Sequence, residues 1–549
     1  MVVDALRAQG VDTVFQVPGE SFIPLLDALL DADNEIRTIT CRHEASAANM
    51  ADAYGNLTGR PGVCIVTRTP GAAHAAVGVT TARQDSTPMV LLVGQAERGI
   101  LGREAFQEFD APGMFGWTAK WAGEAPSAAR LPEYLGRAFQ AALSGRMGPA
   151  VLSLPRDVLG ESADVPLAQR TDPPAPHPHP GDIERLGELL SRAKRPFLIF
   201  GGSGWNADAA AALAAFAERF ALPAAASFRR MDRLDNTHSC YVGDLNFAPD
   251  PRLVARAREA DLILALGTRL GEIPTQTYTL MNSPHPEQTL IHVYPEASEL
   301  GRVFVPDLGI VATPATFLEA TAAIPAIESP PWREWTERVR AEHLETLAPA
   351  PCPGAVDMNE VMRTVRETLP ADAIVTVDAG NFSQWPQRYF PFRRYPSLLG
   401  PASGAMGYSV PAGIAAKAVF PHRPVVTFAG DGGFLMAGSE LATAMQHGLS
   451  PVILVINNSM FGTIRAHQER QYPERVSGTA LQNPDFAAYA ESFGAFGARV
   501  SATHEFAPAF AAALNAGRAA VLDIHLDPEA ISARATLSEI RAAALARKT

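Results

Sequence analysis

The 549-residue chain has only four cysteines, Cys41, Cys64, Cys240 and Cys352, and none of them forms a CxxC pair. This scarcity argues against a disulfide framework or a cysteine-based zinc site, and it suits a reducing, cytoplasmic setting. Basic blocks are also missing, and the 46 Lys and Arg against 58 Asp and Glu give a net charge of −12. We therefore expect no nucleic-acid or membrane partner and favour a small-molecule substrate.

Long apolar runs are absent too, so no segment has the length of a membrane span. The opening stretch "MVVDALRAQGVDTVF" has the pattern of an amphipathic helix followed by a strand, without the basic and apolar regions of a signal peptide. Hydrophobic residues make up 47% of the chain and charged residues 19%. That composition indicates a well-buried globular protein, and its length predicts several domains.

Short apolar, β-branched runs alternate with Ala-rich helical stretches along the chain. Examples are "GVCIVTR" (62–68), "AIVTVD" (373–378), "PVVTFAG" (424–430) and "PVILVIN" (451–457). Continuous rather than alternating hydrophobicity is typical of strands that are buried on both faces of a parallel sheet. The sequence therefore predicts the α/β class with doubly wound parallel sheets.

Two Pro-rich segments, 163–182 and 324–357, interrupt this rhythm, and the second contains a charged helical stretch. We interpret both as linkers. They delimit three predicted α/β domains, at 1–165, 182–325 and 356–549. A weak similarity between 51–72 and 415–434 indicates either common descent of the outer domains or a shared βαβ pattern.

The stretch "TFAGDGGF" (427–434) places glycines and Asp431 at the end of a predicted strand, and Asn457 and Asn458 end the next one. Glycines allow the backbone to approach a diphosphate, and carboxylate and amide oxygens are ligands that Mg²⁺ accepts. Strand ends of this kind are where α/β sheets bind ligands. The alternative is that Asp431 and the two asparagines only cap turns.

With GDG and NN at this interval, the chain resembles the thiamine diphosphate (ThDP) enzymes, and in particular the catalytic subunit of acetolactate synthase and acetolactate synthase-like proteins. The similar stretches include "RHEASAANMADAYGNLTGRPGVCIVT", "GPAVLSLPRDV", "VDAGNFSQWP" and "GAMGYSVPAGIAAK". The resemblance implies a pyrimidine-binding, a central and a diphosphate-binding domain. It also implies that Asp431, Asn458 and the backbone oxygen of Met460 hold a Mg²⁺ that bridges the diphosphate.

Other cofactor contacts follow from the same resemblance. Glu44 matches the glutamate that exchanges a proton with the aminopyrimidine ring, although a carboxylate favoured by a helix dipole would explain it too. Met406 matches the side chain that supports the folded cofactor, with core packing as the alternative. The remaining predicted contacts are Gly380, Asn381, Phe382, Gly404, Gly432, Gly433, Phe461 and Gly462.

In "REAFQEFD" (103–110), Phe106 and Gln107 resemble acetolactate synthase residues that border the substrate, and loop packing is the alternative. His74 stands where these synthases usually carry Asn, and His467 lies in the region of a usual Trp, which leaves acceptor specificity open.

The middle domain reads "ALGTRLGEIPTQTY" where FAD-containing synthases carry an acidic segment. The glycines Gly201, Gly202 and Gly204 are weak evidence for a nucleotide. FAD therefore stays an open alternative.

The resemblance implies decarboxylation of a 2-oxo acid such as pyruvate and ligation of the remaining unit to an acceptor carbonyl. A 2-oxo acid decarboxylase or a carbon–carbon lyase would share every cofactor motif. A non-catalytic homologue is disfavoured because Glu44, Asp431 and Asn458 are all present. We expect a homodimer or homotetramer in which Glu44 of one chain reaches the cofactor held by another.

Overall fold

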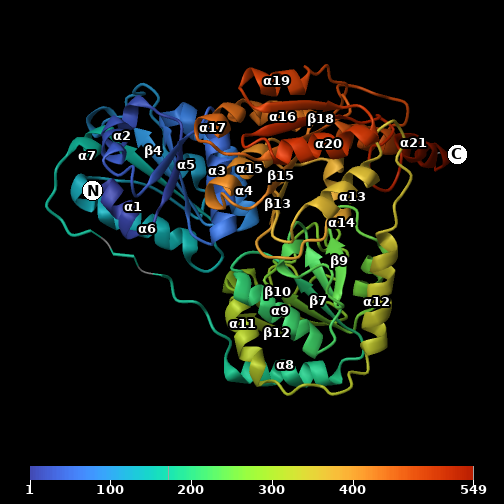
Figure 1. Ribbon diagram of the computed structural model, residues 1–549. Helices are drawn as coiled ribbons and strands as arrows, with labels where there is room; N and C mark the ends of the chain where they lie inside the picture. Colours follow the sequence, from blue (N-terminus) through green and yellow to red (C-terminus); the bar gives the residue numbers. More distant parts are fainter. Residues whose placement is uncertain (168, 171, 548–549) are drawn as a thin grey trace. The chain divides into compact units, whose positions relative to one another are not determined.

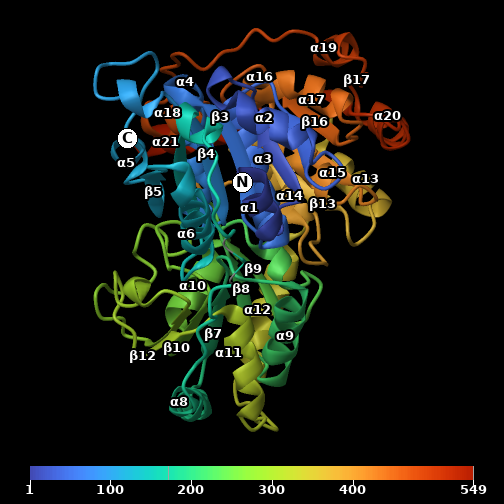
Figure 2. The same cartoon turned by 90° about the vertical axis from the view of Figure 1, so that its left-hand side faces the viewer.

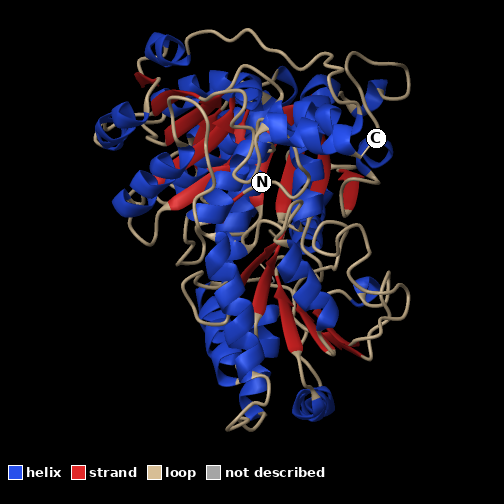
Figure 3. Ribbon diagram, turned by 90° about the vertical axis from the view of Figure 1, so that its right-hand side faces the viewer, coloured by secondary structure: helices blue, strands red, loops and turns tan. Residues whose placement is uncertain are grey.

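The computed structural model describes residues 1–549 except 168, 171 and 548–549. Positions 168 and 171 belong to the first predicted linker and lie outside the described residues. The strands form three six-stranded sheets, and helices lie beside the strands of each sheet (Figures 1 and 3). The predicted α/β class with parallel sheets is confirmed. Among the described residues, no helix combines the length and the apolarity needed to cross a bilayer.

The first sheet has the strand order β2-β1-β3-β4-β6-β5. Its strands are β1 (Thr13–Gln16), β2 (Arg37–Thr40), β3 (Gly62–Thr67), β4 (Met89–Gln95), β5 (Trp121–Glu124) and β6 (Pro149–Pro155). The helices of this part are α1 (Val2–Ala8), α2 (Ile23–Leu30), α3 (Glu44–Thr58), α4 (Arg68–Asp85), α5 (Ala111–Phe115), α6 (Leu131–Leu143) and α7 (Arg156–Gly160).

The central sheet has the different order β12-β11-β10-β7-β8-β9. Its strands are β7 (Pro196–Phe200), β8 (Ala224–Ser227), β9 (Tyr241–Leu245), β10 (Leu262–Leu266), β11 (Thr289–Tyr294) and β12 (Leu308–Val311). The helices are α8 (Pro180–Arg192), α9 (Ala207–Arg219), α10 (Pro251–Glu259), α11 (Pro314–Ala320) and α12 (Arg333–Thr346), and α12 is the charged helix expected in the second linker.

The third sheet has the order β14-β13-β15-β16-β18-β17. Its strands are β13 (Ile374–Val377), β14 (Leu398–Leu399), β15 (Val425–Gly430), β16 (Val452–Asn457), β17 (Phe496–Val500) and β18 (Ala520–His525). The helices are α13 (Met358–Thr368), α14 (Gln384–Tyr389), α15 (Ser409–Val419), α16 (Asp431–Ala437), α17 (Leu441–Gln446), α18 (Gly462–Gln471), α19 (Phe486–Ser492), α20 (Thr503–Leu514) and α21 (Leu537–Ala546). Counted along the chain, the first and third sheets have the same strand order, with β3 and β15 in equivalent places.

The chain forms two compact units. One comprises Met1–Pro173, Ala350–Phe390 and Leu399–Thr549, and the other comprises Pro174–Pro349 and Pro391–Leu398. The first unit therefore combines the N-terminal sheet with most of the C-terminal one.

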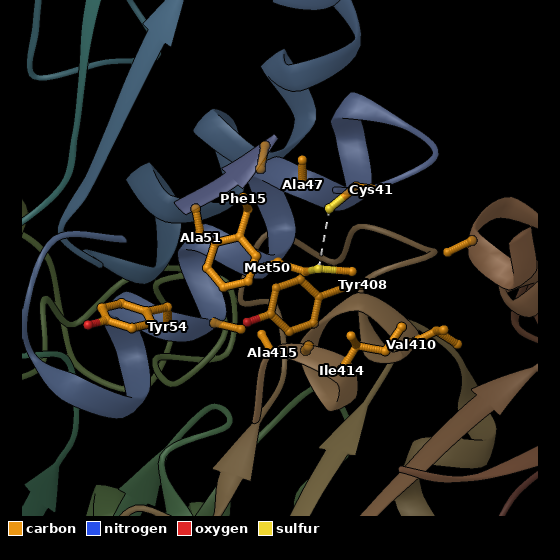
Figure 4. Packing of buried hydrophobic residues seen from close by; sticks show 14 of the residues in the cluster. Phe15, Cys41, Ala47, Met50, Ala51, Tyr54, Tyr408, Val410, Ile414 and Ala415 are labelled. Carbon is orange, nitrogen blue, oxygen red and sulfur yellow. Dashed lines mark hydrogen bonds between the residues drawn. The ribbon is translucent and has the colours of Figure 1, made fainter. Parts of the chain in front are cut away.

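One hydrophobic cluster of the first unit contains residues from both its N-terminal and its C-terminal part. Met50 of α3 and Tyr408, which precedes α15, are both buried in it and lie close together in Figure 4. Helices α3 and α15 lie side by side (Figures 1 and 2). The hydroxyl of Tyr408 donates a 2.7 Å hydrogen bond to the buried carboxylate of Asp52, so the polar end of this ring is paired. Helix α3 also packs tightly on α4, because a Cβ added at Gly78 would lie 2.4 Å from the Cβ of Ala48.

Candidate cofactor site

The carboxyl ends of β15 and β16 bring the two predicted metal-binding motifs together. The strands pair in parallel with Gly430 opposite Ile456, so Asp431 and Asn458 follow at the same sheet edge. After β13 the chain forms β14, which lies on one side of β13 in the sheet. The next strand, β15, lies on the other side of β13. Loops that diverge in this way leave a crevice between them, which is the usual ligand position in an open α/β sheet.

A pocket lies at this edge. Twelve of the thirteen predicted cofactor residues line it, and Glu44 does not. The twelve are Gly380, Asn381, Phe382, Gly404, Met406, Asp431, Gly432, Gly433, Asn458, Met460, Phe461 and Gly462. Sequence reasoning missed other lining residues, which carry no recognisable motif: Ala379, Trp385, Gly430, Ile456, Thr463, Ile464, Leu526, Ala530 and Ile531.

Asp431 is the one acidic residue among the described residues that line the pocket, and this lining contains no Lys, Arg or His. The side chain is buried, and its Oδ1 accepts a 2.9 Å hydrogen bond from the backbone N–H of Gly432. Burial raises the pKa of Asp431, and hydrogen bonds from backbone N–H groups, including those of Ser459 and Met460, oppose that rise. A buried carboxylate without a neighbouring cation favours a metal ion as its partner.

The loop after β16 turns sharply. Ser459 has φ +55°, a left-handed conformation that costs energy for a residue with a side chain. The turn is held by a neighbouring segment: the N–H of Leu481 donates to the carbonyl of Ser459 at 2.8 Å, and the N–H of Phe461 donates to the carbonyl of Thr479 at 2.9 Å. The backbone of residues 458–462 is therefore fixed beside Asp431.

Asn483 lies behind the pocket lining, in contact with Asp431, and the sequence did not reveal it. Its Nδ2 donates to Oδ2 of Asp431 at 2.8 Å and to Oδ1 of Asn457 at 2.9 Å. The amide group of Asn483 thus orients both Asn457 and the carboxylate of Asp431, although these two residues are separated in the chain by a helix and a strand. Asn483 lies in an irregular segment with no recognisable motif, so no signal in the sequence could have singled it out.

Asp378, at the end of β13, positions the loop that carries Met406. Its carboxylate accepts hydrogen bonds from the N–H groups of Gly407 at 2.9 Å and Tyr408 at 3.3 Å. Gly433 has no room for a side chain, because an added Cβ would lie 2.6 Å from Oδ2 of Asp378. The glycine after GDG is therefore required by this packing as well as by any approach of a ligand.

Glu44 is the first residue of α3, where the helix dipole stabilises its carboxylate. The preceding His43 caps the helix, because its Nδ1 accepts a 3.1 Å hydrogen bond from the N–H of Ala45. Oε2 of Glu44 lies 2.8 Å from Nδ1 of His74 on α4, and the rings of His43 and His74 stack at 4.6 Å between centroids. The unexplained His74 of the sequence is thus in direct contact with the predicted acid–base residue.

Phe106 and Gln107, the predicted substrate neighbours, lie in a loop tied to the start of α4. The carbonyl of Gln107 accepts hydrogen bonds from the N–H of Thr69 at 3.1 Å and from its hydroxyl at 2.8 Å. The guanidinium of Arg68 lies 5.9 Å from the ring centroid of Phe106, and that ring is 72% exposed. The loop is anchored while its phenyl group faces solvent, so core packing does not explain Phe106.

His467, for which the sequence left the role open, is exposed on α18 and is not among the pocket residues.

The glycine-rich stretch after β7 is closely packed. A Cβ added at Gly201 would lie 1.8 Å from Oγ of Ser227, and one at Gly202 would lie 1.8 Å from the carbonyl oxygen of Gly267. Close packing of loops therefore accounts for these glycines without a nucleotide.

Family models match all three parts of the chain. The N-terminal TPP binding domain of the thiamine pyrophosphate enzymes matches residues 1–114, their central domain matches 183–321, and their C-terminal TPP binding domain matches 378–524. The chain belongs to the thiamine pyrophosphate enzymes. Thiamine pyrophosphate is the cofactor written here as ThDP.

The similarity to individual proteins supports the same family. The chain is 32% identical to an acetolactate synthase large subunit of Parasynechococcus marenigrum, over 96% of this chain and 86% of the relative. It is 30% identical to the acetolactate synthase isozyme 2 large subunit of Escherichia coli, over 96% and 95%. It is also 30% identical to a probable acetolactate synthase large subunit of Methanocaldococcus jannaschii, over 96% and 91%. The protein is thus an acetolactate synthase-like ThDP enzyme.

The residues of the pocket fit ThDP. The buried Nδ2 of Asn381 has no hydrogen-bond partner among the described residues, and a phosphate oxygen is one acceptor that suits it. Gly462, Thr463 and Ile464, the first three residues of α18, line the pocket, and the N–H groups of a first helical turn have no partner within their own helix. Apolar side chains such as Leu526 and Ile531 form another part of the wall. This combination suits a cofactor with a charged tail and an apolar body.

Proposed function

We propose that the protein is a Mg²⁺-dependent ThDP enzyme that decarboxylates a 2-oxo acid such as pyruvate and joins the remaining unit to an acceptor carbonyl. The observation that carries this proposal is the gathering of twelve predicted cofactor residues around one pocket. When bound, ThDP supplies the electron-accepting ring that decarboxylation needs. The protein binds and orients this group and handles the protons.

Magnesium is part of the proposal because of charge. The described residues that line the pocket include one carboxylate and no basic side chain, so a diphosphate placed there needs a cation. Asp431, the amide oxygen of Asn458 and the carbonyl of Met460 would hold it. All three are oxygen ligands, which suits the preference of Mg²⁺. The ion would in turn give the buried carboxylate of Asp431 a positively charged partner.

A dimer or tetramer of identical chains is proposed for two reasons. Glu44 is not among the described residues that line the pocket of its own chain, which supports delivery of this carboxylate to the pocket of a second copy. Exposed apolar side chains also lie on the helices that begin at the pocket: Leu435 and Met436 on α16 are 46% and 55% exposed, and Ile464 on α18 is 55% exposed. Exposed apolar groups beside a site favour burial against a partner.

The remaining parts of the proposal follow from composition. The proposed substrate is a small 2-oxo acid, and neither nucleic acid nor a membrane is proposed as a partner. A cytoplasmic location is proposed since the four cysteines are free thiols, which suits a reducing compartment. Phe106 and Gln107 are proposed to border the substrate. FAD remains open, since the glycines of the central sheet have a packing role of their own.

The proposal is tested by product analysis. Purified protein with ThDP, Mg²⁺ and ¹³C-labelled pyruvate should release CO₂ and form a five-carbon 2-hydroxy-2-methyl-3-oxo acid, identified by mass spectrometry. Release of CO₂ with free acetaldehyde alone would support the decarboxylase alternative instead. The control is Glu44→Gln, which should bind ThDP and lose about a hundred- to ten-thousand-fold in turnover. No turnover of any 2-oxo acid or 2-hydroxyacyl compound by ThDP-loaded wild type would contradict an enzymatic function.

A further inference from the structure

We propose that His74 is a positioning residue that relays a proton between solvent and the carboxyl group of Glu44. The inference rests on the proposed acid–base role of Glu44, and it assigns a task to a histidine that the family resemblance leaves unexplained. It depends on one contact, the 2.8 Å separation between Nδ1 of His74 and Oε2 of Glu44.

The two side chains of this contact differ in their exposure to solvent. The side chain of Glu44 is 14% exposed, whereas that of His74 is 54% exposed. An acid–base group must return to its starting protonation state after every turnover, and a carboxyl group with little access to water needs a path for that proton. Within the single chain, the imidazole of His74 thus lies between the sheltered carboxyl group and solvent.

The proton balance closes without any net charge. In one state Nδ1–H of His74 donates to the Glu44 carboxylate, and in the other the protonated Glu44 donates to the Nδ1 lone pair. When Nδ1 gives its proton to Glu44, Nε2 accepts one from water and the ring stays neutral. When Glu44 returns its proton to Nδ1, Nε2 releases one to water, so each passage moves a single proton through the ring.

His43 supports this arrangement without joining the relay. Its Nδ1 already accepts the N–H of Ala45, so the neutral ring carries its proton on Nε2. Its stack on His74, at 4.6 Å and 29° between the ring planes, restricts the orientation of the relay ring. Helix capping and ring stacking thus hold His74 with Nδ1 directed at the carboxylate.

A metal site is the competing interpretation, because ligand atoms of His43, Glu44 and His74 lie within 4.8 Å of one another. Ligation by His43 would require either loss of the Nδ1 cap to α3 or an Nε2 without its proton. The existing hydrogen bonds therefore favour proton transfer over ligation. Zinc bound to cofactor-free protein with micromolar or tighter affinity, and lost together with His74, would overturn the relay in favour of a metal site.

The decisive experiment needs no substrate. The exchange of the reactive hydrogen of bound ThDP for deuterium, measured by quenched-flow NMR, should slow about ten- to a hundredfold in His74→Ala and His74→Asn. Asn can still contact Glu44 but cannot relay a proton, so a normal rate in His74→Asn would overturn the proposal. Added imidazole should restore exchange in His74→Ala and leave Glu44→Gln unchanged, since that variant lacks the carboxyl group.

Two further measurements separate a relay from a structural role. Calorimetric affinity for ThDP with Mg²⁺ should stay within about threefold of wild type in both His74 variants, because the diphosphate contacts lie elsewhere. In the cofactor-free protein with ¹⁵N-labelled histidine, His74 should hold its proton on Nδ1 and lose that preference in Glu44→Ala. An unaltered tautomer in Glu44→Ala would count against the contact in solution.

The outcomes distinguish the two levels of inference. Wild type that binds ThDP and exchanges its hydrogen rapidly, with His74→Ala equally rapid, would refute the relay and leave the proposed function intact. Wild type that fails to bind ThDP would refute both. His74 is half exposed on α4, and circular dichroism would verify that the variants keep the wild-type fold.

Discussion

Glu440 holds His43, the residue directly before Glu44. Oε1 of Glu440 accepts the backbone N–H of His43 at 2.9 Å, and both of its oxygens accept the N–H of Arg42, at 3.1 and 3.2 Å. Glu440 ends the 3-10 turn Gly438–Glu440, which follows α16, the helix that Asp431 begins. A carboxylate of the C-terminal part of the chain thus fixes the start of α3.

Replacing Glu440 by glutamine should weaken this attachment. The side chain of Glu440 is fully buried, and its second oxygen also accepts a 2.5 Å hydrogen bond from the hydroxyl of Thr443. An amide offers one acceptor in place of two, and a buried donor left unpaired costs about 1–3 kcal/mol. We expect a lower thermal midpoint and slower turnover with unchanged ThDP affinity, measured by scanning calorimetry and titration. Full activity and stability would show that the segment is held by other contacts.

Replacing Asp431 by alanine should abolish Mg²⁺-dependent retention of ThDP. The diphosphate would lose the one carboxylate that ties its cation to the pocket. The measurement is calorimetric titration of ThDP with and without Mg²⁺, and Glu44→Gln, which keeps the metal ligands, is the matched control. Equal affinity in wild type and Asp431→Ala would remove this residue from the metal site.

Mixing two inactive variants should restore activity. In a heterodimer of Glu44→Gln and Asp431→Ala chains, one site carries both lesions and the other carries neither if each site is shared between chains. About half of the wild-type rate per heterodimer is then expected after subunit exchange, since one of two sites is intact. Inactive mixtures with exchange verified by native mass spectrometry would show that Glu44 serves its own chain.

Acid should destabilise the helix pair that follows the pocket. Hydrogen bonds from Arg541 on α21 lower the pKa of Glu469 on α18 to about 2, and Arg465 contributes further. Because the folded-state pKa lies below the unfolded value of about 4.3, this stabilisation is complete above pH 4.3 and is lost as the pH falls toward 2. Glu469→Gln should therefore flatten the decline of the thermal midpoint between pH 4.5 and 2 and lower it at pH 7. Parallel pH profiles for the two proteins would contradict this linkage.

The sequence predicted those parts of the site that lie next to recognisable strand ends. Asp431 and Asn458 follow buried apolar runs, and parallel pairing then brings them to one edge. Contacts formed by the tertiary fold escaped prediction, as with Glu440 and His43, which are 397 residues apart in the chain. Asn483 escaped for a similar reason, because an amide in an irregular segment gives no local signal until the fold places it beside Asp431.

The shared strand order of the first and third sheets bears on how the activity should change when the protein is diluted. Each chain presents two similar edges, with Asp431 following β15 at one and α4, which carries His74, following β3 at the other. If a site forms where unlike edges of two chains meet, a twofold assembly contains such a meeting twice, and a lone chain contains none. Specific activity would then fall with protein concentration below the dissociation constant of the assembly, even though every pocket residue is intact.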